Sequence, residues 1–143
     1  GADTADTVDK ATASADKLAT QTGGVVAVSG AVDYVTDGTR RVEIANGHPL
    51  MPWVTVMGCS LNGIIASFAA RHDDVFTATV AAMVYFGVAG ESAGEQAKGP
   101  GSFAVAFLDA LMAVDADTLI DRAKLRLPQP DPEQDRPQDP QKD

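Results

Sequence analysis

The sequence contains a single cysteine and few basic residues. One cysteine, Cys59, excludes an internal disulfide framework and fits a reducing, cytoplasmic environment. The 11 Lys and Arg residues face 20 Asp and Glu residues, which gives a net charge of −9. Nucleic-acid phosphates require a basic surface, and anionic membranes attract basic segments. The composition therefore favours a cytoplasmic protein that binds neither nucleic acid nor a membrane.

Long apolar runs are also missing. Residues 1–9 are polar and acidic and lack the basic start and apolar run of a signal peptide, so we expect none. The most apolar stretch, residues 75–89, is too short and too rich in Ala and Gly for a membrane span. With 143 residues, 45% of them hydrophobic, the chain has the length of one domain and can bury a core.

The first third of the chain predicts a helix followed by a strand. Residues 7–20 have amphipathic spacing, with Asp6 or Thr7 as the expected N-cap and Gly23 at the end. The β-branched run at residues 25–28 is typical of a strand buried on both faces, as in a parallel sheet with helices on each side. In such sheets ligands bind just past the carboxyl ends of the strands, where Ser29-Gly30 lies; these two residues also fit a plain turn.

A β-hairpin is predicted next. Residues 33–36 and 40–44 alternate in polarity around Asp37-Gly38, which is a strong turn signal. We expect an antiparallel excursion from the sheet. Arg40 and Arg41 are either a phosphate clamp or, as we favour, solvated strand residues.

Residues 54–70 read as a loop that turns into a buried helix. Its apolar residues recur at helical spacing and form one stripe: Leu61, Ile64, Ile65, Phe68 and Ala69. Gly58 is placed just before this helix, where free N–H groups and the helix dipole make an anion site. Cys59 lies at the same point, either as a small buried capping residue or as a thiol made reactive by its position.

The remaining chain predicts two more helices and a tail. Residues 75–96 carry small residues at helical spacing, which allow another helix to approach closely. Within this helix Glu91 and Glu95 are one turn apart. They could be metal ligands, but we favour a solvated helix face. A last helix is expected from Ser102. From residue 127 the chain is acidic and proline-rich, and we expect residues 127–143 to be a disordered tail.

Three groups of motifs together resemble one family. They are VAVSGAVDYVTDG at residues 26–38, then GHPLM, VT and GCSL between residues 47 and 61, then AKGPGSF at residues 97–103. Their order and spacing resemble those of the hydroxyethylthiazole kinases of thiamine salvage. The resemblance covers about residues 1–120, and we take residues 1–126 as the C-terminal half of a domain like that of the family. It implies a partial ribokinase-like α/β fold of three layers, with a mostly parallel sheet, helices on both faces and a β-hairpin excursion.

The resemblance also implies an activity and a set of site residues. Family members use ATP and Mg²⁺ to phosphorylate the hydroxyl of 4-methyl-5-(2-hydroxyethyl)thiazole, as homotrimers with active sites between subunits. By position, Cys59 is the catalytic residue, Gly58 and Met57 form the anion hole, and Ser29 and Gly30 contact the nucleotide. No residue is assigned to the thiazole or to a metal, and His48 is expected to be structural.

Two departures leave an alternative open. Val56 stands where the family commonly has glycine, and Trp53 where a basic residue is common. We expect the isolated chain to be inactive without an N-terminal half. The alternative is a degenerate, non-catalytic remnant that keeps a nucleotide-binding or oligomerising surface. A thiol enzyme built on Cys59 ranks last, because no second cysteine or well-placed histidine accompanies it.

Overall fold

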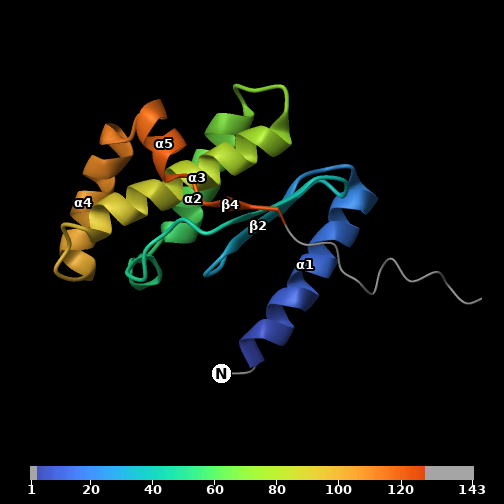
Figure 1. Cartoon of the computed structure of the whole chain (residues 1–143), viewed down its shortest axis with the longest axis horizontal. Helices are drawn as coiled ribbons and strands as arrows, with labels where there is room; N and C mark the ends of the chain where they lie inside the picture. Colours follow the sequence, from blue (N-terminus) through green and yellow to red (C-terminus); the bar gives the residue numbers. More distant parts are fainter. Residues whose placement is uncertain (1–2, 128–143) are drawn as a thin grey trace, which may run out of the picture.

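The computed structural model describes residues 3–127, and residues 3–10 only as helical backbone. Its elements are α1 (Asp3–Thr22), β1 (Val26–Val28), β2 (Asp33–Thr36), β3 (Arg41–Ile44), a 3₁₀ turn η1 (Met51–Trp53), α2 (Met57–Ala69), α3 (Val75–Gly94), α4 (Pro100–Ala113), α5 (Ala116–Arg122) and β4 (Leu125–Arg126) (Figure 1). The predicted tail lies outside the described residues, except for Leu127.

The four strands pair in the order β1-β2-β3-β4, and every pair in the described chain is antiparallel. The expected mostly parallel sheet is therefore not what these strands form. The reason is the length of the connections: a parallel pair needs a crossover of a dozen or more residues, whereas residues 29–32 alone join β1 to β2. The burial predicted for β1 is also wrong, because Ala27 is exposed and its neighbours are half-buried.

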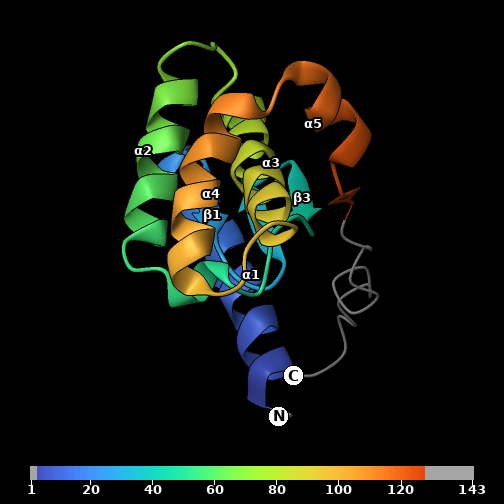
Figure 2. The ribbon, with the colours of Figure 1, turned by 90° about the vertical axis from the view of Figure 1, so that its left-hand side faces the viewer.

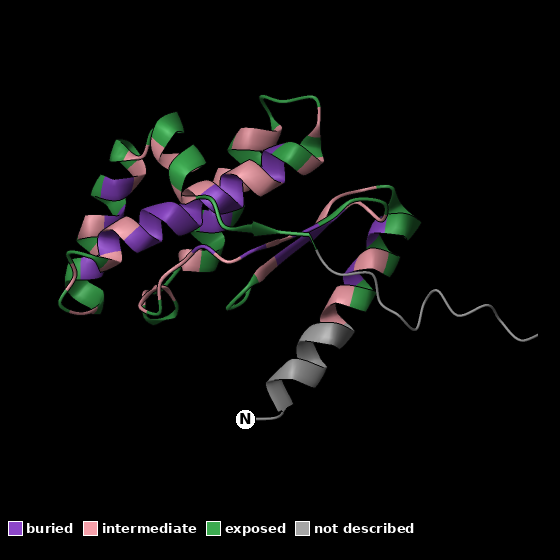
Figure 3. Cartoon of the chain, in the orientation of Figure 1, coloured by how far each residue is buried: buried purple, intermediate pink, exposed green. Residues whose placement is uncertain are grey.

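Helices cover both faces of the sheet, as predicted. On one face, Tyr34 Oη donates to Asp16 Oδ1 of α1 at 2.8 Å, and Arg41 pairs with Asp16 Oδ2 at 3.0 Å. The opposite face places Val35, Val42 and Ile44 in the hydrophobic core with α3. α3 lies beside β3 in Figure 2, and most of its length is coloured as buried in Figure 3. α2 and α4 pack against α3 in turn, which makes α3 the central element.

α3 combines apolar length with burial. By length and composition it is the one described helix that passes a membrane-span test, with a mean hydropathy of 1.3, but 67% of that window is buried inside the protein. Such burial is that of a core helix. α2 and α4 pack against α3, as its small-residue spacing predicted. Its glycines also admit the loop after β3: a Cβ on Gly94 would overlap the His48 ring, and one on Gly90 would lie 2.6 Å from Met51 Sδ.

The local sequence signals are mostly confirmed. Gly23 and Gly38 adopt positive φ, at +66° and +88°, at the end of α1 and in the β2–β3 turn. Asp74 caps α3 by accepting from the Phe76 N–H at 3.2 Å. Ser102 is the third residue of α4 rather than its N-cap, which is Gly99. The N-cap predicted at Asp6 or Thr7 is wrong, because α1 already begins at Asp3 and both residues lie within it.

Candidate functional site

A cavity of about 690 Å³ opens between the end of β1, the loop after β3, the start of α2 and the middle of α3. Ser29 and Gly30 line it from one side, and Met57 and Gly58 from another. Four of the five site residues expected from sequence therefore meet in one cavity. Its remaining lining includes both polar and apolar residues: Ala31, Asp33, Ala45, Asn46, Gly47, His48, Pro49, Met51, Pro52, Leu61, Met83, Phe86 and Gly87.

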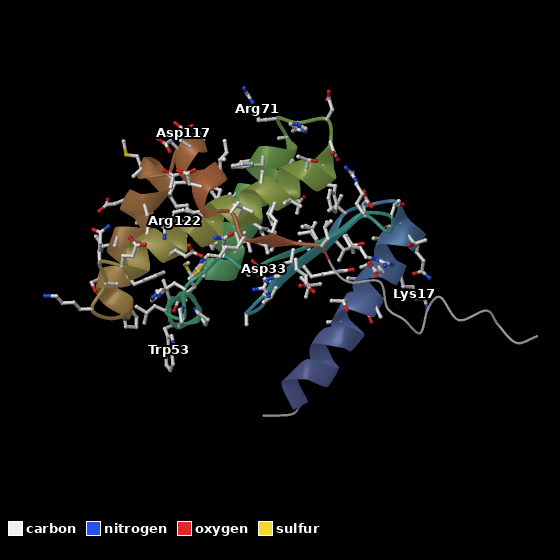
Figure 4. The ribbon with its side chains drawn as sticks, in the orientation of Figure 1. Lys17, Asp33, Trp53, Arg71, Asp117 and Arg122 are labelled. Carbon is white, nitrogen blue, oxygen red and sulfur yellow. The ribbon has the colours of Figure 1, made fainter. Side chains whose placement is uncertain are left out.

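The β1–β2 loop is held by a carboxylate from the sheet. The Gly30 N–H donates to Asp33 Oδ1 at 2.8 Å, so the first residue of β2 fixes the turn that presents Ser29 (Figure 4). Burial raises the pKa of Asp33 and outweighs the opposing effect of that hydrogen bond. Asp33 was not singled out from sequence, because its role depends on the turn of the chain before it.

The start of α2 supplies free backbone donors. The N-cap residue is Val56, at φ 75° and ψ 4°, and no side chain caps the helix there. The first helical hydrogen bond runs from the Ser60 N–H to Val56 O at 2.9 Å. The N–H groups of Met57 and Gly58 precede it, and uncapped first-turn N–H groups favour anions. This end of α2 therefore provides an anion-binding edge to the cavity.

Two details of the α2 prediction need correction. The helix begins at Met57, so Gly58 lies within its first turn, and the left-handed residue is Val56. Cys59 is exposed, which excludes the interpretation as a buried capping residue. It is the third residue of α2 and follows cavity-lining Gly58, but it is not itself among the lining residues.

The opposite wall of the cavity is the loop between β3 and α2. His48 stacks on Phe103 with ring centroids 5.7 Å apart, and its Nδ1 accepts from the Leu50 N–H at 3.2 Å. These contacts fit the structural role expected for His48, which also lines the cavity. Asn46 is 6% exposed and binds the buried Glu91 of α3. Sequence reasoning missed Asn46, which has no local motif.

Two weaker candidate sites have partners within the protein. Arg40 pairs with Asp37 and Asp74, both at 2.7 Å, and Arg41 pairs with Asp16, which fits the favoured interpretation as strand residues rather than a phosphate clamp. Glu91 and Glu95 both bind Arg122, at 3.4 and 2.7 Å. The favoured interpretation as a solvated face fits Glu95, whose side chain is 63% exposed, but is wrong for Glu91, which is buried. No group of three or more His, Cys, Asp or Glu side chains suited to a metal occurs within residues 3–127.

Comparison with known proteins decides the family. Residues 1–117 match the model of the hydroxyethylthiazole kinase family. The chain belongs to the hydroxyethylthiazole kinase family. It is 57% identical over 125 residues to a hydroxyethylthiazole kinase of Cereibacter sphaeroides strain ATCC 17029, covering 87% of this chain and 47% of the relative.

Two further members of the family agree. A hydroxyethylthiazole kinase of Rhizobium leguminosarum bv. trifolii is 53% identical over 126 residues, with 87% of this chain and 47% of the relative covered. The structure of a hydroxyethylthiazole kinase protein from Pyrococcus horikoshii OT3 superposes with a TM-score of 0.79 at 38% identity, covering 85% of this chain and 47% of that one. The fold is thus the α/β ribokinase-like fold of the family, and the chain spans about half the length of these relatives.

Proposed function

We propose that this chain supplies the C-terminal half of a hydroxyethylthiazole kinase, which transfers the γ-phosphoryl group of ATP to the hydroxyl of 4-methyl-5-(2-hydroxyethyl)thiazole. The observation that carries the proposal is the single cavity shared by Ser29-Gly30 and by Met57-Gly58. These pairs come from separate elements, and a phosphoryl-transfer site needs both a nucleotide contact and stabilisation of the phosphoryl charge.

Each residue then has a defined task. Ser29 and Gly30 contact the nucleotide, and the Asp33 carboxylate holds their turn. The N–H groups of Met57 and Gly58 stabilise the charge on the phosphoryl group as its bond to the ADP oxygen breaks and its bond to the substrate oxygen forms. Cys59, the next residue along α2 and exposed to solvent, orients the hydroxyl, and its thiolate form takes up the proton that the hydroxyl loses and becomes the thiol. The apolar side chains of Leu61, Met83 and Phe86 line the cavity and exclude water from it.

The residues of this chain offer more binding groups for the nucleotide phosphates than for a magnesium ion. The uncapped start of α2 suits a phosphate, whereas among the described residues Asp33 is the one carboxylate that lines the cavity. Mg²⁺ is commonly held by substrate phosphates with one or two carboxylates, and it neutralises phosphate charge when bound. We place its further protein ligands in the part of the family domain that this chain does not span, and we propose a homotrimer in the cytoplasm for the assembled enzyme.

The test is a complementation assay. The chain is mixed with the segment of the Cereibacter sphaeroides relative that it does not cover, and ADP and thiazole phosphate are measured with ATP and Mg²⁺. We expect phosphorylation by the mixture and none by the chain alone. Turnover by the isolated chain, or an inactive mixture whose two segments form a folded complex, would overturn the proposal.

Matched variants sharpen the result. Cys59→Ala is expected to lower kcat by about 10²-fold, the usual scale of a positioned proton acceptor, with little change in the KM for ATP. Cys59→Asp is expected to retain activity. A folded mixture that binds ATP without turnover would instead identify the non-catalytic remnant.

A further inference from the structure

A buried carboxylate on α3 lies directly behind one wall of the cavity. Glu91 is 8% exposed, and its Oε1 accepts three hydrogen bonds. The donors are Asn46 Nδ2 at 3.0 Å, the Gly47 N–H at 3.2 Å and Lys124 Nζ at 2.8 Å. Asn46 and Gly47 line the cavity, so Glu91 holds that wall from the side opposite the cavity.

The Asn46 side chain is fully engaged in the same cluster. Its Nδ2 also donates to Arg122 O at 2.8 Å, and its Oδ1 accepts from the Lys124 N–H at 2.8 Å. The Ala45 N–H donates to Lys124 O at 2.9 Å. An amide offers two donors and a carbonyl oxygen, and each is used here, so Asn46 has no free donor to offer a ligand. Its task is to hold the wall in place.

At Asn46 no α3 side chain packs beneath the wall, because α3 presents Gly87 there, whereas Leu50 and Met51 further along the loop pack against the core. A Cβ on Gly87 would lie 2.7 Å from Asn46 Cβ and 2.9 Å from the Asn46 backbone carbonyl. The loop therefore lies directly on the helix backbone, and the polar cluster determines its position. Although burial raises the pKa of Glu91, the hydrogen bonds from Lys124, Gly47 and Asn46 outweigh it and lower that pKa, which keeps the carboxylate charged.

We propose that Glu91 is a positioning residue, which with Asn46 and Lys124 clamps the C-terminal segment 122–126 onto the cavity wall and so holds the nucleotide site in shape. We call these three residues the clamp. Arg122 and Lys124 lie beyond the residues that match the family model, which end at 117. The part of the proposal that concerns nucleotide rests on the proposed function, but the part that concerns the wall does not.

Amide hydrogen exchange on the whole chain tests the wall. Glu91→Gln removes the charge that three donors share, and we expect amides in residues 45–51 to exchange about tenfold faster, on the scale of losing a charged hydrogen bond. Glu95→Gln is the matched control: Glu95 is one turn along α3 and also pairs with Arg122, but its side chain is 63% exposed. We expect the amides of residues 45–51 in Glu95→Gln to exchange at the wild-type rate.

A milder variant tests the same proposal if Glu91→Gln does not fold. Lys124→Met removes one donor from a half-exposed side chain and leaves the Lys124 backbone contacts, and we expect exchange in residues 45–51 about threefold faster. Lys124→Arg should restore wild-type rates. The proposal is overturned if Lys124→Met exchanges as wild type, or if its exchange rises equally across all described helices, because that would be general destabilisation.

Kinetics of the complemented enzyme test the nucleotide part. We expect Lys124→Met to raise the KM for ATP about fivefold and to change kcat less than twofold, with recovery in Lys124→Arg. Unchanged KM values would overturn this part. If the wild-type complex is inactive, the proposed function fails, and the exchange result still decides whether the clamp holds the wall.

Discussion

Replacing Val56 by glycine is expected to stabilise this chain. Val56 adopts φ 75° and is the one non-glycine residue with positive φ among those described. A left-handed conformation places Cβ against the following carbonyl and costs about 1–2 kcal/mol, with the upper end appropriate to a β-branched side chain. The valine side chain offsets little of this strain by packing, because the residue is 60% exposed.

The expected gain follows from two opposing terms. Glycine removes up to about 2 kcal/mol of strain, and its greater freedom in the unfolded chain costs about 0.5–1 kcal/mol. We therefore expect the free energy of unfolding to rise by about 1 kcal/mol, which corresponds to about 3 °C in Tm for a domain of this size. Urea unfolding followed by circular dichroism measures it.

Two controls separate backbone strain from other effects of the substitution. Val56→Ala keeps a Cβ in the left-handed position and should stabilise less than glycine. Val105→Gly replaces a valine of similar exposure, 65%, within α4 and should destabilise by about 0.5 kcal/mol. Equal or lower stability of Val56→Gly relative to wild type would refute the reasoning.

Three further changes probe the packing and the clamp. Gly87→Ala should cost about 1–3 kcal/mol, because its Cβ would meet the Asn46 backbone. Gly63→Ala, whose Cβ would have no atom within 4 Å, should stabilise α2 by up to about 1 kcal/mol. The Tm values of the two variants, measured by thermal unfolding, test both expectations. Because the pKa of Glu91 is lowered in the folded protein, its charged form stabilises the fold at pH values above the ordinary pKa of 4.5, and this contribution is lost as the pH falls through the folded pKa. Urea titrations from pH 7 to 3 should therefore show a steeper loss of unfolding free energy in wild type than in Glu91→Gln. Tyr34→Phe should cost about 1 kcal/mol by removing the hydrogen bond to Asp16, and equal urea midpoints for the variant and wild type would contradict this.

Local signals account for the parts of the fold that sequence predicts well. Asp37-Gly38 specifies the hairpin because the turn needs a residue with positive φ, and Gly38 supplies it at +88°. The apolar stripe of α2 is likewise confirmed: Leu61 is buried, and its other members are half-buried. Each of these features depends on residues a few positions apart, which is the range that periodicity and turn chemistry report.

Features that depend on distant residues were not predictable in the same way. The bond between Asn46 and Glu91 joins positions 45 residues apart, and no local pattern marks either of them. The predicted parallel pairing of β1 is wrong for a related reason. An unbroken β-branched run indicates a strand, but the direction of its partner depends on the length of the connection and on which strands lie next to it. In the described chain β1 has the one neighbour β2, and it pairs with it antiparallel.

The Val56 position shows why a departure from a family motif need not remove the site. An anion site at a helix start depends on where the backbone N–H groups point, and any residue that holds the required φ and ψ presents them equally. Val56 does adopt the left-handed conformation that glycine adopts readily, and its side chain is exposed and absent from the cavity lining. The substitution therefore acts on stability, through strain, and leaves the cavity open. Trp53 is similar: it is 74% exposed, projects away from the loop and does not line the cavity (Figure 4). Both departures that suggested a degenerate remnant thus lie outside the cavity that the proposed reaction needs.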